Sequence, residues 1–202
     1  ILEHPITTPP QYNKEILDNR KRIAADNCVV DYAFYGAAGG QYPEEIVPLS
    51  KEGIVAYKSF LHQAPAGREG EFVGLTLAND AEIMTGMREI AKTGLMMASH
   101  AENNDMIVHN IEEFRAKGWT KPIDHCKSRP AITEYSTVSK LILMAKATGC
   151  KLELAHMSTP ESCELAKQAK SEGQSVFVET CPHYLLLDES YLEKFGSFAR
   201  CN

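Results

Sequence analysis

Three side chains with metal-binding chemistry follow extended apolar runs in this sequence. Lys58, His100 and His156 each come at the end of a strand-like segment. The carboxyl ends of the parallel strands of a (β/α) barrel meet at one face, where side chains far apart in sequence converge. The gaps between the three residues are too wide for a small zinc module. They suit neighbouring strands, so the spacing predicts a cluster at one rim.

The chemistry of such a cluster depends on neutral nitrogen atoms. Neutral imidazoles are common zinc ligands. A lysine surrounded by apolar residues such as Tyr57 and Phe60 has its ammonium form disfavoured by desolvation, and its neutral amine can add carbon dioxide to form a carbamate. A carbamate can bridge two divalent cations. An isolated lysine, however, is commonly a surface residue and an isolated histidine commonly a hydrogen-bonded one, so the residues alone leave both interpretations open.

Size and composition indicate one soluble globular unit. The chain has 202 residues, a formal net charge of -6 and 44% hydrophobic residues, enough for one sizeable core. The acidic balance argues against nucleic acid or an anionic membrane as the main partner. Six cysteines stand at irregular spacings without a CxxC pair, which is typical of reduced thiols in the cytoplasm. No apolar run reaches the roughly 18 residues of a membrane span.

Apolar strand-like runs alternate with segments of helical period, the pattern of a parallel α/β sheet. The predicted strands are 28–34, 54–60, 95–100, 151–156 and 175–180. The predicted helices are 11–26, 43–52, 79–93, 103–117, 132–148 and 160–172. A closed barrel needs about eight strands. The pattern therefore leaves an open doubly wound sheet and an incomplete barrel as alternatives.

Several short motifs occur in an order that resembles the cyclic amidohydrolases. That family comprises allantoinases, hydantoinases or dihydropyrimidinases, and dihydroorotases. The motifs are Tyr57-Lys58-Ser59-Phe60, Ser99-His100-Ala101-Glu102-Asn103, Ser128-Arg129-Pro130 with Glu134, Ala155-His156-Met157-Ser158, and Glu179-Thr180-Cys181-Pro182-His183-Tyr184. The resemblance covers nearly the whole chain, and it is the set of motifs, more than any one of them, that is specific.

The resemblance implies a site with two divalent metal ions, most simply zinc. Lys58 would be the carboxylated bridging lysine, and His100 and His156 would be ligands of one cation. His183 would lie near the substrate, a small cyclic amide or ureide. The segment around His183 resembles allantoinases most, and Gln63 replaces a tyrosine that many dihydropyrimidinases carry there.

The same resemblance implies the fold and its extent. We expect residues 1–202 to form one partial TIM barrel, a (β/α)8 barrel of the metal-dependent amidohydrolase type with about five to six βα units. The family's His-x-His pair and its proton-transferring aspartate are not found, so no catalytic acid or base is assigned in this chain. We expect a fragment that is inactive by itself, within an intact cytoplasmic enzyme that is a homo-oligomer.

Other interpretations stay open for particular residues and for the whole chain. Arg129 and Glu134 would form a structural ion pair or a helix-start device, Glu102 would sit in the first turn of a helix, and Cys181 would be structural. The chain could instead be a non-catalytic relative that serves as an assembly scaffold. It could also be a metal-free lyase in which Lys58 forms a Schiff base.

Overall fold

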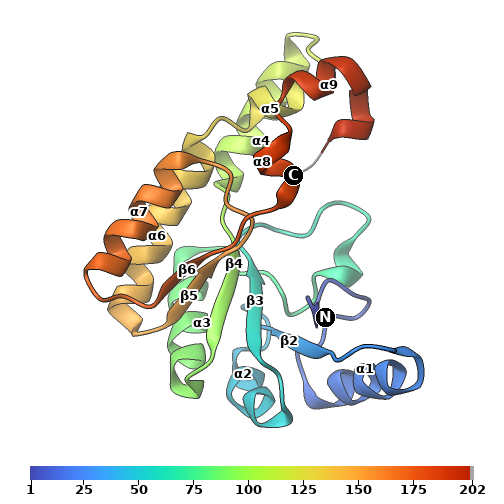
Figure 1. Cartoon of the computed structure of the whole chain (residues 1–202), viewed down its shortest axis with the longest axis vertical. Helices are drawn as coiled ribbons and strands as arrows, with labels where there is room; N and C mark the ends of the chain where they lie inside the picture. The colour runs from blue at the N-terminus through green and yellow to red at the C-terminus, as the bar shows by residue number, and fades with distance from the viewer. Residues whose placement is uncertain (201–202) are drawn as a thin grey trace.

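The computed structural model describes residues 1–200, which contain one sheet of six parallel strands (Figure 1). The strands pair in sequence order, and each pair is parallel. They are β1 (Leu2–Glu3), β2 (Ala33–Ala37), β3 (Ala56–Phe60), β4 (Met96–His100), β5 (Lys151–Leu154) and β6 (Val176–Val178). A doubly wound sheet reverses its strand order at a switch point, whereas a barrel does not. The predicted α/β fold is confirmed, as an incomplete barrel.

Nine α-helices accompany these strands in residues 1–200. They are α1 (Lys14–Asn27), α2 (Pro43–Leu49), α3 (Asp80–Thr93), α4 (Asn104–Ala116), α5 (Asp124–Ser128), α6 (Ile132–Thr148), α7 (Pro160–Ser171), α8 (Pro182–Leu186) and α9 (Ser190–Phe195). In Figure 1, α1, α2, α3, α6 and α7 lie around the lower and left sides of the fan of strands. The helices α4, α5, α8 and α9 gather above the point where the strands converge. None of the described helices combines the length and apolar character needed to cross a bilayer.

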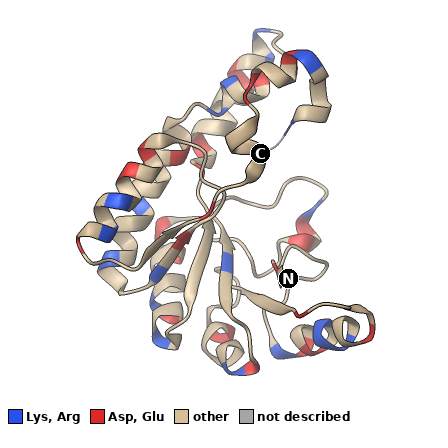
Figure 2. Ribbon diagram, viewed as in Figure 1, with Lys and Arg blue, Asp and Glu red and all other residues tan. Residues whose placement is uncertain are grey.

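The register of the sheet separates an apolar face from a face that carries charge. Tyr57, Met97 and Leu152 lie in register on β3, β4 and β5, and their side chains are fully buried in the core against the helices. Because successive side chains of a strand point to opposite faces, the next register position turns the other way. That position places Lys58 beside Ala98, and Ala98 beside Glu153. In Figure 2 most charged residues lie on the helices, and Lys58 is the charged residue of β3.

The described elements depart from the predicted ones mainly near the two ends of the chain. The predicted strand 28–34 is wrong over residues 28–32, since β2 begins only at Ala33 and Val29 is 98% exposed. The two-residue β1 and the short helices α5, α8 and α9 were not predicted. The remaining strands and helices lie where they were expected, with ends shifted by a few residues.

Side-chain caps explain where several helices begin. The Asn13 side chain accepts a hydrogen bond from the amide of Ile16, so α1 starts at Lys14 and not at the predicted residue 11. Thr159 accepts from Ser162 in the same way at the start of α7. These caps fix the helices that follow the strands, and so fix the loops that carry candidate site residues.

Candidate metal centre

The two predicted histidine ligands contact each other at the carboxyl ends of neighbouring strands. His100 is the last residue of β4, and His156 comes two residues after β5. Nδ1 of His100 lies 3.0 Å from Nε2 of His156, and the ring centroids are 4.8 Å apart. His156 has a left-handed backbone, with φ 45°, a conformation that costs free energy in a residue other than glycine. The loop therefore holds this imidazole in place against a local conformational preference.

A carboxylate fixes the orientation of the His100 ring. Oε2 of Glu102 lies 2.8 Å from Nε2 of His100, and Oε1 lies 3.9 Å from Nε of Arg129. Burial would raise the pKa of Glu102, but the hydrogen bond with His100 and the charges of His100 and Arg129 outweigh it and hold this pKa below its usual value. An ionised Glu102 accepts a hydrogen bond from the N–H at Nε2 of His100. Nδ1 of His100 then presents its lone pair toward His156.

Two expectations about this segment were wrong. Glu102 does not lie in the first turn of a helix, because α4 begins at Asn104 and Asn103 is its cap. Arg129 does not form the expected ion pair with Glu134, because the carboxylate near it is that of Glu102. Glu134 does lie in the first turn of α6, as the helix-start alternative expected.

Lys58 is buried in the middle of β3, not at its end as expected. It is 2% exposed, and burial lowers its pKa to about 8 although the charges of Glu179 and Glu153 act in the opposite direction. Its Nζ lies 5.2 Å from the centroid of the Phe60 ring, which in turn stacks on His100 with 5.3 Å between centroids. The Phe60 ring thus lies close to both the Lys58 amine and the His100 imidazole.

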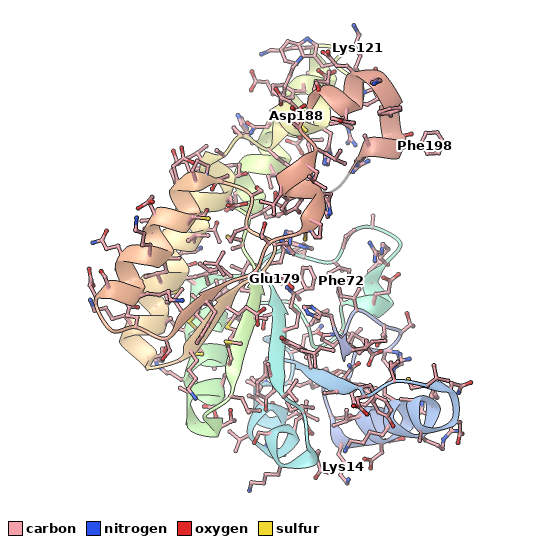
Figure 3. The ribbon with its side chains drawn as sticks, in the orientation of Figure 1. Lys14, Phe72, Lys121, Glu179, Asp188 and Phe198 are labelled. Carbon is pink, nitrogen blue, oxygen red and sulfur yellow. The ribbon has the colours of Figure 1, made fainter. Side chains whose placement is uncertain are left out.

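The backbone around His156 is held by β6 and the residues after it. Oε2 of Glu179 accepts a hydrogen bond of 2.9 Å from the amide of His156, and the Glu179 carbonyl accepts one of 2.8 Å from Met157. Figure 3 labels Glu179 where the central strands converge. Burial, followed by the charges of His100 and Lys58, lowers the pKa of His156 to about 4. The imidazole of His156 is therefore neutral at physiological pH and able to donate a lone pair.

A cavity of about 810 Å³ opens in front of the two imidazoles. His100, Glu102 and His156 line it together with residues of the long connection after β3 and of α4. Among those of the connection are Phe60, His62, Gln63, Arg68 and Phe72. The long connection after β3 thus borders the cavity, as loops at binding sites commonly do.

His62 is a functional candidate that the sequence interpretation missed. Its ring centroid lies 5.5 Å from that of His100 and 5.5 Å from that of Phe72. Nδ1 of His62 lies 2.7 Å from the carbonyl oxygen of Gln63 and donates to it, since a carbonyl can only accept. Its position four residues after Lys58 was the available signal.

His183 lies on a separate helix that follows β6. It belongs to α8, is half-buried, and its ring centroid is 4.5 Å from that of Tyr184. His183 is not among the described residues that line the cavity, and neither is Lys58. The role of His183 near a substrate stays a prediction. Cys181 is the residue before α8 and is partly buried.

The donor atoms present fit part of a metal coordination shell. Within residues 1–200, no three or more His, Cys, Asp or Glu side chains are grouped so that they could hold a metal ion. The described site offers two imidazole nitrogens that face each other, with a buried amine nearby. Imidazole is a good ligand for zinc. A lowered pKa favours the neutral form of the Lys58 amine, and the neutral form is the one that reacts with carbon dioxide. These donors suit a divalent cation that takes further ligands from elsewhere.

Comparison with known proteins gives relatives along nearly the whole chain. No family model matches. The allantoinase of Deinococcus radiodurans is 30% identical over 201 residues, which are 99% of this chain and 44% of that protein. The allantoinase of Bacillus velezensis is 34% identical over 194 residues, 96% of this chain and 41% of that protein. The chain thus spans less than half the length of these curated relatives.

Solved structures agree with these relatives. L-hydantoinase (dihydropyrimidinase) from Arthrobacter aurescens superimposes with a TM-score of 0.92 at 30% identity, over 99% of this chain and 43% of that one. A D-hydantoinase gives 0.83 at 26% identity, over 96% and 41%. The dihydroorotase of Campylobacter jejuni, at 14% identity over 96% of this chain and 49% of that one, shares the fold with a TM-score of 0.66. Over nearly its whole length, this chain is a homologue of the cyclic amidohydrolases, as its motifs predicted.

Proposed function

We propose that the protein containing this chain hydrolyses a cyclic amide with the help of divalent metal ions, and that Lys58, His100 and His156 are metal ligands. The contact of 3.0 Å between Nδ1 of His100 and Nε2 of His156 is the observation that carries the proposal. Both nitrogens lie on a cavity of about 810 Å³, large enough for a small ring. The named activities of the relatives point to the same reaction class.

Each residue of the site has a role in this proposal. His100 and His156 bind one cation through the two nitrogens that face each other, and Glu102 keeps the His100 ring in the tautomer that allows it. The neutral amine of Lys58 forms a bond to the carbon of carbon dioxide and releases one proton. The resulting carbamate is negatively charged, and its two oxygen atoms would serve as ligands for the cations. When bound, two divalent ions, zinc by the nature of the donors, would supply Lewis acidity and an activated water.

The net reaction opens the ring. Water adds to the carbonyl carbon, the bond between carbon and nitrogen breaks, and the nitrogen leaves with a proton. An aspartate outside this chain is the proposed proton carrier. The apolar walls given by Phe60, Phe72 and Ile107 exclude water around the ring, while the imidazole of His62 offers a polar contact.

Allantoin or a related hydantoin is the proposed substrate. The curated relatives reported above are named allantoinases, and the solved neighbours of highest TM-score given above are named hydantoinases. Gln63 lines the cavity at the position where the resemblance to dihydropyrimidinases would require tyrosine. Hydrolysis of a dihydropyrimidine or of dihydroorotate is the alternative within the same class. We further propose that the intact enzyme is cytoplasmic and a homo-oligomer.

A scaffold without catalytic activity is the alternative of another class. Such a protein has no need for the paired imidazoles or for the buried lysine, and all three are present here. A Schiff-base lyase would use Lys58 alone, which leaves the contact between His100 and His156 without a purpose. The scaffold predicts no turnover with or without metal. The lyase predicts turnover that chelators do not change.

We propose also that residues 1–202 form a single partial domain and that they are inactive in isolation. The described residues hold two imidazoles and one lysine, which is short of a complete set of ligands for two ions.

The test is hydrolysis by the complete protein of a panel of allantoin, hydantoin, dihydrouracil and dihydroorotate, before and after chelation and after return of Zn²⁺. The proposal expects turnover of allantoin or hydantoin that is lost on chelation and restored by zinc. Turnover that survives chelation, or no turnover of any member by the zinc-loaded protein, would contradict it. The chain of 202 residues, assayed in parallel, should show no turnover.

A further inference from the structure

The first turn of α6 contacts the loop that follows His100 and the loop that follows His156. The carbonyl oxygen of Thr133 accepts a hydrogen bond of 2.7 Å from the amide of Asn103, three residues after His100. The next residue, Glu134, accepts hydrogen bonds from the loop that follows His156. One turn of one helix therefore ties together two loops that come from different strands.

Glu134 makes an unusually complete set of contacts for a carboxylate. One oxygen accepts from the amide of Ser158 at 3.0 Å and from its hydroxyl at 2.7 Å. The other accepts from the amide of Thr159 at 3.1 Å and from its hydroxyl at 2.7 Å. Glu134 is only 8% exposed, and loss of one partner of a buried hydrogen bond leaves the other partner unsatisfied at a cost in stability.

The segment that Glu134 grips begins two residues after His156. His156 has the left-handed backbone, and such a conformation persists only where the surroundings determine it. Glu179 holds the segment at the His156 amide, and Glu134 holds it from the other side at Ser158 and Thr159. Within residues 1–200, no hydrogen bond joins the His156 side chain to Glu134, so any effect of Glu134 on the imidazole passes through the backbone.

We propose that Glu134 is a positioning residue, which sets the distance between the imidazoles of His100 and His156 by fixing the loop from His156 to Thr159. The effect of Glu134 on the positions of the two rings concerns this chain alone. The effect of Glu134 on metal affinity rests on the proposed function. Glu134 was expected to form an ion pair with Arg129 or to act at a helix start. The positioning role replaces the ion pair and is compatible with its place in the first turn of α6.

The test compares three variants of the chain of 202 residues. Glu134→Ala removes the carboxylate. Glu134→Gln keeps one acceptor oxygen but turns an N–H₂ toward donors, so its effect should be intermediate. Val138→Ala is the control, because Val138 is fully buried on α6 one turn later and its truncation weakens the core without touching the loop.

The first readout needs no metal. Amide exchange is followed by NMR at His156, whose N–H bonds to Glu179 and not to Glu134, together with the imidazole ¹⁵N shifts of His100 and His156. We expect Glu134→Ala to speed exchange at His156 roughly tenfold, about the worth of one charge-assisted hydrogen bond, and to shift both imidazoles. Val138→Ala should change neither beyond its effect on the helices. Equal behaviour of Glu134→Ala and Val138→Ala at these probes would overturn the proposal.

The second readout is zinc binding measured by calorimetry. Glu134→Ala should weaken binding roughly tenfold or more, with Glu134→Gln in between and Val138→Ala unchanged. Zinc binding equal to that of the unaltered chain in Glu134→Ala would overturn the positioning role. If the unaltered chain bound no zinc, the titration would be made on the complete protein. Absence of zinc binding there would contradict the proposed function, and the NMR comparison on the chain would still decide the role of Glu134.

Discussion

Nδ1 of His100 and Nε2 of His156 lie 3.0 Å apart although 56 positions separate the two residues in the sequence. The parallel pairing of β4 with β5 brings their carboxyl ends together, and the loops after these strands turn the two rings toward each other. Without a cation, the N–H of one ring donates a hydrogen bond to the ring nitrogen of the other. With a cation, both can donate lone pairs, because burial keeps the pKa of His156 low.

The orientation of His100 should depend on Glu102. Replacing Glu102 with glutamine leaves an amide that cannot enforce the same tautomer, so we expect zinc affinity to fall roughly 10- to 100-fold with little change in stability. Calorimetric titration of the chain with Zn²⁺ measures this. Glu164→Gln, an exposed change on α7, should leave the affinity unaltered. An unchanged affinity in Glu102→Gln would remove Glu102 from the site.

Lys58 should be the lysine that carries carbon dioxide. Its burial favours the neutral amine, whereas Lys51 is exposed. In the zinc-loaded protein with ¹³C-labelled bicarbonate, we expect a carbamate signal by NMR that disappears in Lys58→Met. The same signal should persist in Lys51→Met. A carbamate signal that survives Lys58→Met would assign the modification to another residue.

Two leucines of α6 test where the core lies. Leu141 is fully buried, and Leu143 is 65% exposed on the same helix. Leu141→Ala should lower the free energy of unfolding by about 2–5 kcal/mol, because it removes buried methyl groups and leaves a cavity. Leu143→Ala should change it by less than about 0.5 kcal/mol. Denaturant titration of both variants would contradict the packing if the two losses were alike.

Cys150 gives a prediction about alkaline pH. Burial raises the pKa of its thiol to about 12 in the folded chain, well above the value of 9.0 expected for an unfolded thiol. The folded state therefore keeps a proton that the unfolded state loses. Its stabilising effect is complete below about pH 9 and declines as the pH rises from there toward 12.

The measurement is the slope of the unfolding free energy between about pH 9 and 11, which should be steeper by up to one proton in the unaltered chain than in Cys150→Ala. At pH 8 a thiol reagent should label the exposed Cys28 and Cys163 quickly and Cys150 only after unfolding. Rapid labelling of Cys150 in the folded chain would contradict its burial.

Much of the fold could be predicted because strand and helix periods alternate regularly from residue 54 onward. The prediction failed near the N-terminus for a physical reason. Val29 and Val30 have high strand propensity yet are exposed, whereas β2 is built from small and aromatic residues around Gly36. A two-residue strand such as β1 is too short to have any period.

The candidate site could be predicted only as far as its candidate ligands, whose binding of a metal stays a prediction. His100 and His156 stand at strand ends, and topology alone brings such ends together. Glu102 and Glu134 could not be assigned, since their partners are set by how loops turn and by a helix from a different part of the chain. Lys58 was predicted at the end of its strand but lies in the middle of β3. The sequence could not show this, because a buried mid-strand lysine has the same local sequence as one at a strand end.

Zinc binding by the histidine pair tests the central claim most directly. Calorimetric titration of the chain should give one site whose affinity falls at least tenfold in His100→Ala and in His156→Ala, while the exposed His109→Ala on α4 leaves it unchanged. Zinc binding of equal strength in all three variants would contradict the claim that these two imidazoles form a metal site.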